Sequence, residues 1–168
     1  MNRLWRLVRL SATFGAALLG AGLLGSTGCA TFAVIPGTTV VDSKINRDIL
    51  EVCERYRKAM EERDPATLLA LADPNYYEDS GTPKGDDDYG YEGLKEVLSK
   101  RLSALKTLRY NIQYRKIDVS GDHAKVDIRY DASYQLATEM GDRWERKQND
   151  KEIELDKTNG RWLIVAGM

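Results

Sequence analysis

The chain has few of the residues that carry most redox and transition-metal chemistry. Among its 168 residues are two cysteines, Cys29 and Cys53, and one histidine, His123. Cys29 ends a leader-like segment, so Cys53 is the only cysteine expected inside the folded domain, and no disulfide can form there. His123 stands in no motif with Cys53. The sequence disfavours a Cys–His mechanism and a transition-metal site, and we expect neither a metal nor a cofactor.

An excess of basic charge is also missing. The chain has 25 basic and 26 acidic residues. Removal of residues 1–28 takes away three arginines and no acid, which leaves 22 basic against 26 acidic residues and a formal charge of −4. Because nucleic-acid binding depends on basic surface, we expect no nucleic-acid partner. The aspartates at 86–88 lack the spaced ligands and the closing glutamate of a calcium loop, which favours a solvated loop.

The first 28 residues have the layout of a secretory signal. Three arginines precede an uncharged run at residues 10–25, and small residues at 26–28 lead directly to Cys29. The run is shorter than the about 20 apolar residues of a permanent membrane helix. This segment resembles the leader of bacterial lipoproteins, in which the cysteine is lipidated and becomes the mature N-terminus. The alternative is an ordinary signal peptide with an incidental cysteine.

The resemblance to lipoproteins implies a location in the cell. A chain lipidated at Cys29 would be membrane-anchored in the cell envelope and would face the periplasm. Ala30 follows the cysteine, where an aspartate would resemble an inner-membrane retention signal, so the outer membrane is favoured. Residues 29–41 lack charge and contain a Pro-Gly break, which is typical of a tether. The folded domain is then expected at residues 42–168.

One long strand is predicted at the centre of this domain, from Asp122 to Thr138. Apolar and polar residues alternate along it without a break, the pattern of a sheet with one buried and one wetter face. Strands usually run about 5 or 6 residues, so a strand of this length predicts the spine of a large twisted sheet. The side chains expected on its buried face are Ala124, Val126, Ile128, Tyr130, Ala132, Tyr134 and Leu136.

Helical periodicity appears three times before this strand. Asp42 or Ser43 is a suitable N-cap for an amphipathic helix of about 20 residues. Asp64-Pro65 predicts a short second helix that ends at Ala72. A third helix begins near Tyr91 with leucines on one face. Between the second and third helices we expect a short strand at residues 75–79 and then a loop.

Four antiparallel strands are expected to follow as a meander. Changes of apolar parity predict one β-bulge near Arg115-Lys116 and a second at residues 145–151, between Trp144 and Ile153. Asn159-Gly160 is a strong hairpin turn. The last strand, 161–168, is apolar on both faces and should be covered on both sides.

This order of elements resembles the nuclear transport factor 2-like superfamily, in particular its SnoaL-like and ketosteroid-isomerase-like branches. The resemblance covers residues 43–168. It implies an α+β fold: a cone-shaped domain with three N-terminal helices packed on a strongly curved, mainly antiparallel β-sheet. The local features that support it are Arg55-Tyr56, the Ala-Leu-Ala-Asp run at 70–73, Glu78-Asp79, Glu92-Gly93-Leu94 and Gly160-Arg161-Trp162.

The resemblance also implies an apolar cavity inside the cone. Members include isomerases, cyclases and dehydratases as well as non-catalytic binding domains, so the fold alone does not decide function. By resemblance to the ketosteroid isomerases, Tyr56 would be the oxyanion donor and Asp79 the proton shuttle. Glu152, the candidate for a third acid, has the parity of the outward face. The residues expected to line a ligand site are Tyr56, Tyr76, Tyr77, Tyr110, Tyr130, Tyr134, Trp144 and Trp162.

Three hypotheses follow for the domain. The first is a non-catalytic envelope domain that binds a small amphipathic ligand in the cone. The second is an isomerase, cyclase or hydratase that uses Asp79 and Tyr56, and the alternative for these two residues is a core aromatic and a solvated loop acid. The third is a dimerisation or protein-interaction module. The long central strand and the apolar last strand suggest more hydrophobic sheet than three helices cover, which predicts a homodimer.

Overall fold

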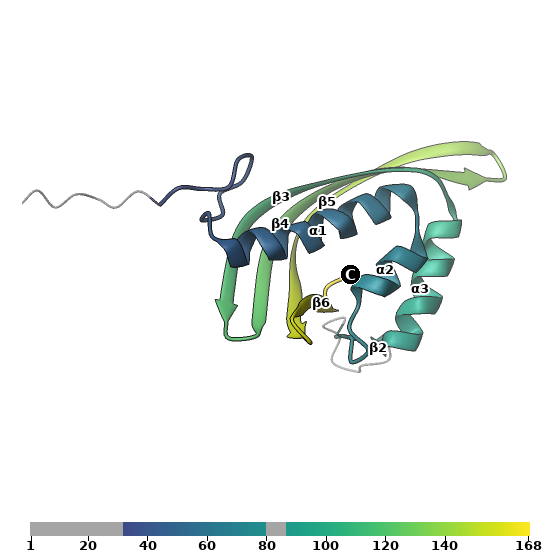
Figure 1. The fold of residues 1–168 in the computed structure, drawn as a ribbon. Coiled ribbons are helices and arrows are strands. Elements are labelled where there is room, and N and C mark those ends of the chain that lie inside the picture. Colours follow the sequence, from purple (N-terminus) through teal and green to yellow (C-terminus); the bar gives the residue numbers. More distant parts are fainter. Residues whose placement is uncertain (1–31, 80–86) are drawn as a thin grey trace, which may run out of the picture. The chain divides into compact units, whose positions relative to one another are not determined.

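The computed structural model describes residues 32–79 and 87–168, which belong to a compact unit from Phe32 to Met168. Its sheet has the order β3-β4-β5-β6, every pair is antiparallel, and the sheet arches over the helices (Figure 1). This is the α+β arrangement predicted from the sequence. The strands are β3 (Leu105–Ser120), β4 (His123–Thr138), β5 (Gly141–Thr158) and β6 (Arg161–Ala166).

The helices begin and end where their capping residues predict. α1 spans Lys44–Glu62 and is capped by Ser43, whose hydroxyl accepts from the Asn46 N–H at 3.1 Å. α2 spans Pro65–Leu71 and is capped by Asp64. α3 spans Tyr91–Ser103 and buries Leu94, Leu98 and Leu102. None of the helices in the described part of the chain is long and apolar enough to cross a membrane.

A second, two-stranded sheet precedes α3. β1 (Tyr77–Glu78) lies in the predicted short strand, and it pairs with β2 (Tyr89–Gly90), which falls in the segment predicted as a loop. Two residues are too few to show a period-2 pattern, so β2 had no sequence signal. The pairing brings the start of α3 close to the end of α2.

β4 is the predicted central strand. It pairs with β3 on one side and with β5 on the other along its full length, and its inward residues Ala124, Val126 and Ile128 are buried. The predicted bulge in β3 is confirmed as a register shift between Tyr114 and Lys116. Asn159 and Gly160 both have positive φ in the β5–β6 turn, as a two-residue hairpin requires.

The second predicted bulge is wrong. β5 pairs with β4 from Gly141 to Asp156 without a register shift, and the irregularity of β5 lies instead between Glu154 and Leu155, toward β6. Trp144 therefore keeps the outward parity of Glu152 and is 53% exposed. A tryptophan near the end of a long hairpin does not need to be buried, and this is why the parity argument failed.

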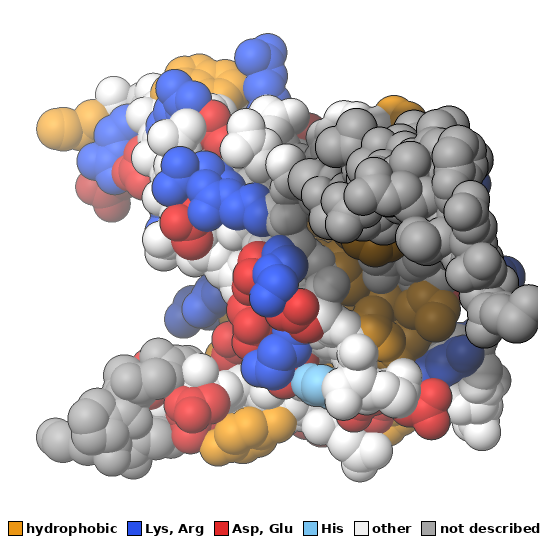
Figure 2. Space-filling view, turned by 90° about the vertical axis from the view of Figure 1, so that its left-hand side faces the viewer, with side chains coloured by type: hydrophobic (Ala, Val, Ile, Leu, Met, Phe, Trp, Pro, Cys, Tyr) orange, Lys and Arg blue, Asp and Glu red, His pale blue; other side chains and the backbone are white. Residues whose placement is uncertain are grey.

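The outward face of the sheet is charged. Lys125 contacts Glu152 and Glu154, and Arg129 contacts Asp150. Figure 2 shows basic and acidic side chains interleaved on this side of the molecule. β6 buries Trp162 and Ile164, whereas its other face is only half-buried. The expected surplus of apolar sheet is therefore absent from the outward face, because the β4 and β5 residues there are mainly polar.

Residues 32–41 were predicted as part of a tether, but they pack on the domain. Val40 is 2% exposed and belongs to the hydrophobic core. The Thr39 hydroxyl donates to the Arg115 carbonyl at 2.6 Å, and Val34 forms an isolated bridge with Val41. The folded body thus begins about ten residues before the predicted boundary.

Asp73 joins the helices to the sheet and is the one charged side chain buried in the described segments, at 2% exposure. Its N–H donates to the Ile164 carbonyl at 2.8 Å. Its carboxylate accepts from the Asn75 N–H and from the Thr158 hydroxyl, each at 2.8 Å. These bonds fix the point at which the chain leaves α2 and enters β1.

Candidate functional site

A cavity of about 450 Å³ lies between the helices and the inward face of the sheet. This volume is within the range of small-molecule sites. Its walls come from α1, α3, the strands β2 to β5 and Met168, and they are mainly apolar. The aliphatic lining residues are Met60, Leu94, Val97, Leu98, Leu102, Ala104, Leu105, Leu108, Ala132, Leu136 and Met168.

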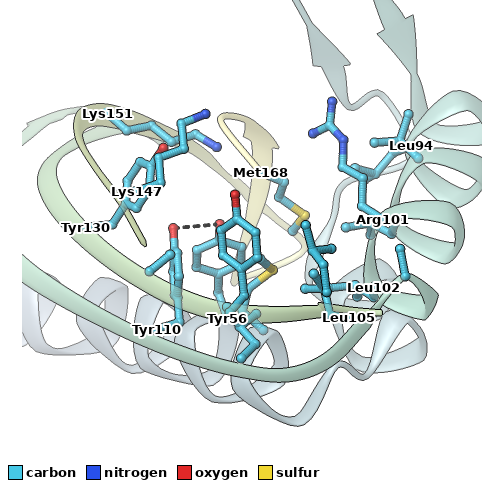
Figure 3. Close-up of a pocket in the computed structure, with 18 of the residues that line it drawn as sticks. Tyr56, Leu94, Arg101, Leu102, Leu105, Tyr110, Tyr130, Lys147, Lys151 and Met168 are labelled. Carbon is cyan, nitrogen blue, oxygen red and sulfur yellow. Dashed lines mark hydrogen bonds between the residues drawn. The ribbon is translucent and has the colours of Figure 1, made fainter. Parts of the chain in front are cut away.

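Three tyrosines form an aromatic cluster on one wall (Figure 3). The Tyr56 and Tyr110 rings meet edge to face with centroids 6.0 Å apart, and their hydroxyls are 3.4 Å apart. The Tyr130 ring stacks on Tyr110 at 5.5 Å. Tyr56 is 1% exposed because α1 turns it into the core. Such pairs add to the stability that burial alone provides.

Burial keeps the phenols of Tyr56 and Tyr110 neutral. Desolvation raises the pKa of Tyr110 to about 12, although the hydrogen bond with Tyr56 acts in the opposite direction. Desolvation also raises the pKa of Tyr56 well above its ordinary value, and the neighbouring Tyr110 hydroxyl raises it further. A neutral phenol can donate or accept one hydrogen bond but carries no charge. The cluster therefore offers a ligand polar contacts on an otherwise apolar wall.

Several residues predicted to bind ligand do line this cavity. Tyr56, Tyr110, Tyr130 and Tyr134 are among its lining residues. The Tyr134 hydroxyl donates to Glu145 at 2.9 Å, which fixes the ring at the β4–β5 side. The three strand tyrosines follow from parity, since they share the inward face of β3 or β4, and Tyr56 follows from the helical spacing of α1.

The other predicted ligand residues are not part of the lining. Tyr76 is buried behind it and stacks on Tyr89, which does line the cavity. Tyr77 is 54% exposed and donates to Asp88. Trp144 is outward-facing, as described above. Trp162 lies in a separate surface depression between α1 and β6, where Lys157 stands over its ring.

The structure does not bring Asp79 and Tyr56 into one pocket. Asp79 is exposed just after β1 and is not among the residues that line the cavity, whereas Tyr56 is almost completely buried. A proton shuttle must reach the same substrate as the oxyanion donor. Glu152 faces outward and contacts Lys125, so it does not supply a third acid.

Of these two adjacent acids, Glu78 is instead the one that faces inward, and it is half-buried. It accepts hydrogen bonds from the Tyr76 hydroxyl and from the Gly167 N–H, and the Met168 N–H donates to Tyr76 at 3.0 Å. Only a glycine fits at position 167: its φ is +86°, and a Cβ there would lie 2.2 Å from the carbonyl oxygen of Glu152 on the neighbouring strand. Sequence reasoning missed Glu78, because a two-residue strand gives no parity signal.

Three basic residues were also missed. Arg101 of α3 and Lys147 and Lys151 of β5 line the cavity. The two lysines are four residues apart on the strand and share the inward parity of Ile153, a signal that was available in the sequence. Across residues 32–79 and 87–168 no group of three or more His, Cys, Asp or Glu side chains could hold a metal ion.

Comparison with known proteins places this geometry in a family. Residues 45–167 match the family model of the calcium/calmodulin dependent protein kinase II association domain. The chain belongs to this family. No curated protein matches the sequence. Because the match spans residues 45–167, it includes every lining residue of the cavity except Met168.

Solved structures similar to this association-domain chain show the same fold at low sequence identity. An association domain from Xanthomonas campestris has a TM-score of 0.59 and 18% identity, and the match covers 81% of this chain and 90% of that one. A nuclear transport factor 2-like protein from Salmonella enterica has a TM-score of 0.62 and 16% identity, with 73% and 87% covered. The fold is therefore nuclear transport factor 2-like, as predicted.

A third similar structure carries an enzyme name. It is a scytalone dehydratase from Novosphingobium aromaticivorans, with a TM-score of 0.60 and 20% identity, and the match covers 73% of this chain and 80% of that one. At this identity the likeness shows the fold alone. The assignment of chemistry depends on the site.

Substitution of the adjacent acids Glu78 and Asp79 tests which of the two carboxylates faces inward. Glu78→Ala should lower the free energy of unfolding by about 1–3 kcal/mol, because the Tyr76 hydroxyl and the Gly167 N–H lose a common acceptor. Asp79→Ala, at an exposed position, should change it by less than about 0.5 kcal/mol. Urea unfolding followed by tryptophan fluorescence measures both values. Equal losses in the two variants would contradict the assignment of Glu78 as the inward acid.

Proposed function

We propose that this domain binds a small amphipathic molecule in its cavity without converting it. The observation that carries the proposal is the cavity itself: about 450 Å³, walled by aliphatic side chains on α3 and β3, with phenols and basic groups confined to parts of its lining. A cavity of this kind solvates an apolar body and orients a polar end. A domain that used its core only for stability would fill such a space, since protein interiors are close-packed.

The enzyme hypothesis has less support. Catalysis of the ketosteroid-isomerase type needs a carboxylate within hydrogen-bond reach of the substrate. Asp79 is exposed and is not among the residues that line the cavity. The named dehydratase among the similar structures is less than 25% identical to this chain. We therefore retain binding as the function.

Filling the cavity should abolish binding. Ala132 is buried on the inward face of β4, and Ala132→Phe places a ring in the cavity. We expect it to weaken binding of the neutral fluorescent probe N-phenyl-1-naphthylamine at least tenfold. Ala137→Phe makes the same change at an exposed position of the same strand and should leave affinity within twofold.

Fluorescence titration of the purified domain measures this affinity, and circular dichroism checks that both variants are folded. If the wild-type domain does not bind the probe, or if Ala132→Phe and Ala137→Phe bind it equally, the proposal is contradicted.

We also propose that the domain assembles with a second copy of itself. Its family is named for association, which supports assembly of this chain. The strands β3 and β6 are the edges of the sheet, and the half-buried face of β6 is a further apolar surface. Burial of such surface favours symmetric dimers.

Sedimentation gives a direct test of assembly. At micromolar concentration the domain should sediment at twice the mass of one chain in analytical ultracentrifugation. A single species at the mass of one chain would contradict the proposed dimer.

We further propose that Cys29 is lipidated and anchors the domain to a membrane of the cell envelope, with the outer membrane favoured. Residues 1–31 lie outside the described part of the structure, so the support is the sequence alone: a basic and apolar leader with small residues directly before Cys29. One acyl chain gives only weak membrane binding, whereas several give stable anchoring.

Loss of the cysteine should therefore release the protein. Cys29→Ser is expected to move it from the membrane pellet to the soluble fraction, as measured by ultracentrifugal fractionation and immunoblotting. Cys53→Ser, at a buried core position, is the matched control and should remain in the pellet. A Cys29→Ser protein that still pellets with membranes would contradict lipidation.

A further inference from the structure

Basic side chains enter the cavity from two elements. Lys147 and Lys151 extend from β5, and Arg101 approaches from α3 on the other side (Figure 3). Lys151 lies opposite Ile128, a buried core residue, and is half-buried itself. Lys147 and Arg101 are exposed. Lys151 is thus the deepest of the three cations, and the other two stand nearer the solvent.

These cations differ from those on the opposite face of the same strands. The outward-facing basic residues of β4 and β5 are Lys125, Arg129 and Arg146, and each contacts a carboxylate within 3 Å. Neither lysine of the cavity has such an ion pair, and neither has Arg101, within the segments that the structure describes. The three cations that line the cavity thus lack the carboxylate partners that the outward-facing cations of β4 and β5 have.

The unpaired positive charge of the half-buried Lys151 opposes folding. Burial is the largest cause that lowers the pKa of Lys151 to about 8; Glu78 acts in the opposite direction, and repulsion by Arg101 and Lys147 contributes to the lowering. Moving charge from water into apolar surroundings costs free energy unless a counter-charge is present. Cations without a counter-charge lower the stability of the ligand-free protein. Such cations are expected at a site where a bound anion supplies the counter-charge.

Glu78, which acts on the charge of Lys151, and Glu145, which shares the inward face of β5 with Lys147, already have partners. Glu78 accepts from the Tyr76 hydroxyl and the Gly167 N–H. Glu145 accepts from Tyr134 and contacts Arg143. Four tyrosines that line the cavity have raised pKa values and so add no negative charge at neutral pH: Tyr56, Tyr89, Tyr110 and Tyr134.

We infer that the ligand is an amphipathic organic anion, whose acidic group is held by Lys151 and Lys147 with Arg101 facing it from α3. Its apolar body lies against the leucines of α3 and β3. A single carboxylate or sulfonate matches this arrangement, because two ammonium groups and a guanidinium can all donate to its oxygens. This inference rests on the proposed binding function and adds the chemical class of the ligand.

Two probes that share an aromatic frame separate charge from hydrophobicity. N-phenyl-1-naphthylamine is neutral, and 8-anilinonaphthalene-1-sulfonate adds one sulfonate. Lys151→Met and Lys147→Met keep most of the side-chain volume and remove the charge. Each should weaken the anionic probe about tenfold, the effect of losing one hydrogen bond to a charged group, and should change affinity for the neutral probe less than twofold.

Arg146→Met is the matched control. It removes one positive charge from the same strand, next to Lys147 but on the outward face, where Arg146 contacts Asp131. It should leave the affinity for both probes within twofold. Ala132→Phe should abolish binding of both, which shows that the two probes occupy the same cavity.

Proton uptake provides an independent readout. A bound anion favours the protonated form of Lys151, so its pKa rises on binding. At pH 8 binding should therefore take up protons, and affinity should fall as the pH rises above 8. Calorimetric titrations in two buffers of different ionisation enthalpy measure the protons taken up, and Lys151→Met should abolish most of this uptake.

The outcomes separate the two proposals. If the neutral probe binds in the cavity but the lysine variants weaken both probes equally, or weaken neither, the anion inference is overturned and the binding function stands. If neither probe binds the wild-type domain, the binding function itself is overturned. Selective loss of the anionic probe together with loss of proton uptake supports the inference.

Discussion

The burial of Asp73 is the constraint on which the arrangement of helices, sheet and cavity depends. Its backbone and side chain together bond to β6, to the end of β5 and to the turn before β1. A buried carboxylate without such donors would cost several kcal/mol. These bonds fix the end of α2 on the strands β5 and β6, on the same side of the sheet as the cavity.

Much of the fold could be predicted because its signals are periodic and long. β4 alternates over its whole length, and the parity change at Tyr114 correctly located the bend of β3. The same reasoning failed at Trp144. Parity reports burial only where a strand is covered, and the far half of the β4–β5 hairpin carries few inward contacts.

The site was predicted less completely, for a physical reason. On a long strand, a tyrosine in step with the buried residues faces the core. Tyr110, Tyr130 and Tyr134 were predicted in this way. Glu78 depends on a two-residue pairing with β2, which is a tertiary event without a local pattern. Lys147 and Lys151 have the inward parity of the core residues. A lysine in a polar stretch is usually solvated, however, so parity alone does not predict that it lines a cavity.

The contact between Met168 and Tyr76 has a consequence for the order of folding. It joins residues 92 positions apart, whereas the meander from β3 to β6 is connected by tight turns. Closing a long loop costs more entropy than closing a short one, so long-range contacts tend to form late. During synthesis the aliphatic lining would remain open until the segment around Met168 had emerged and docked. For that interval the apolar surface that later encloses the cavity is exposed to water.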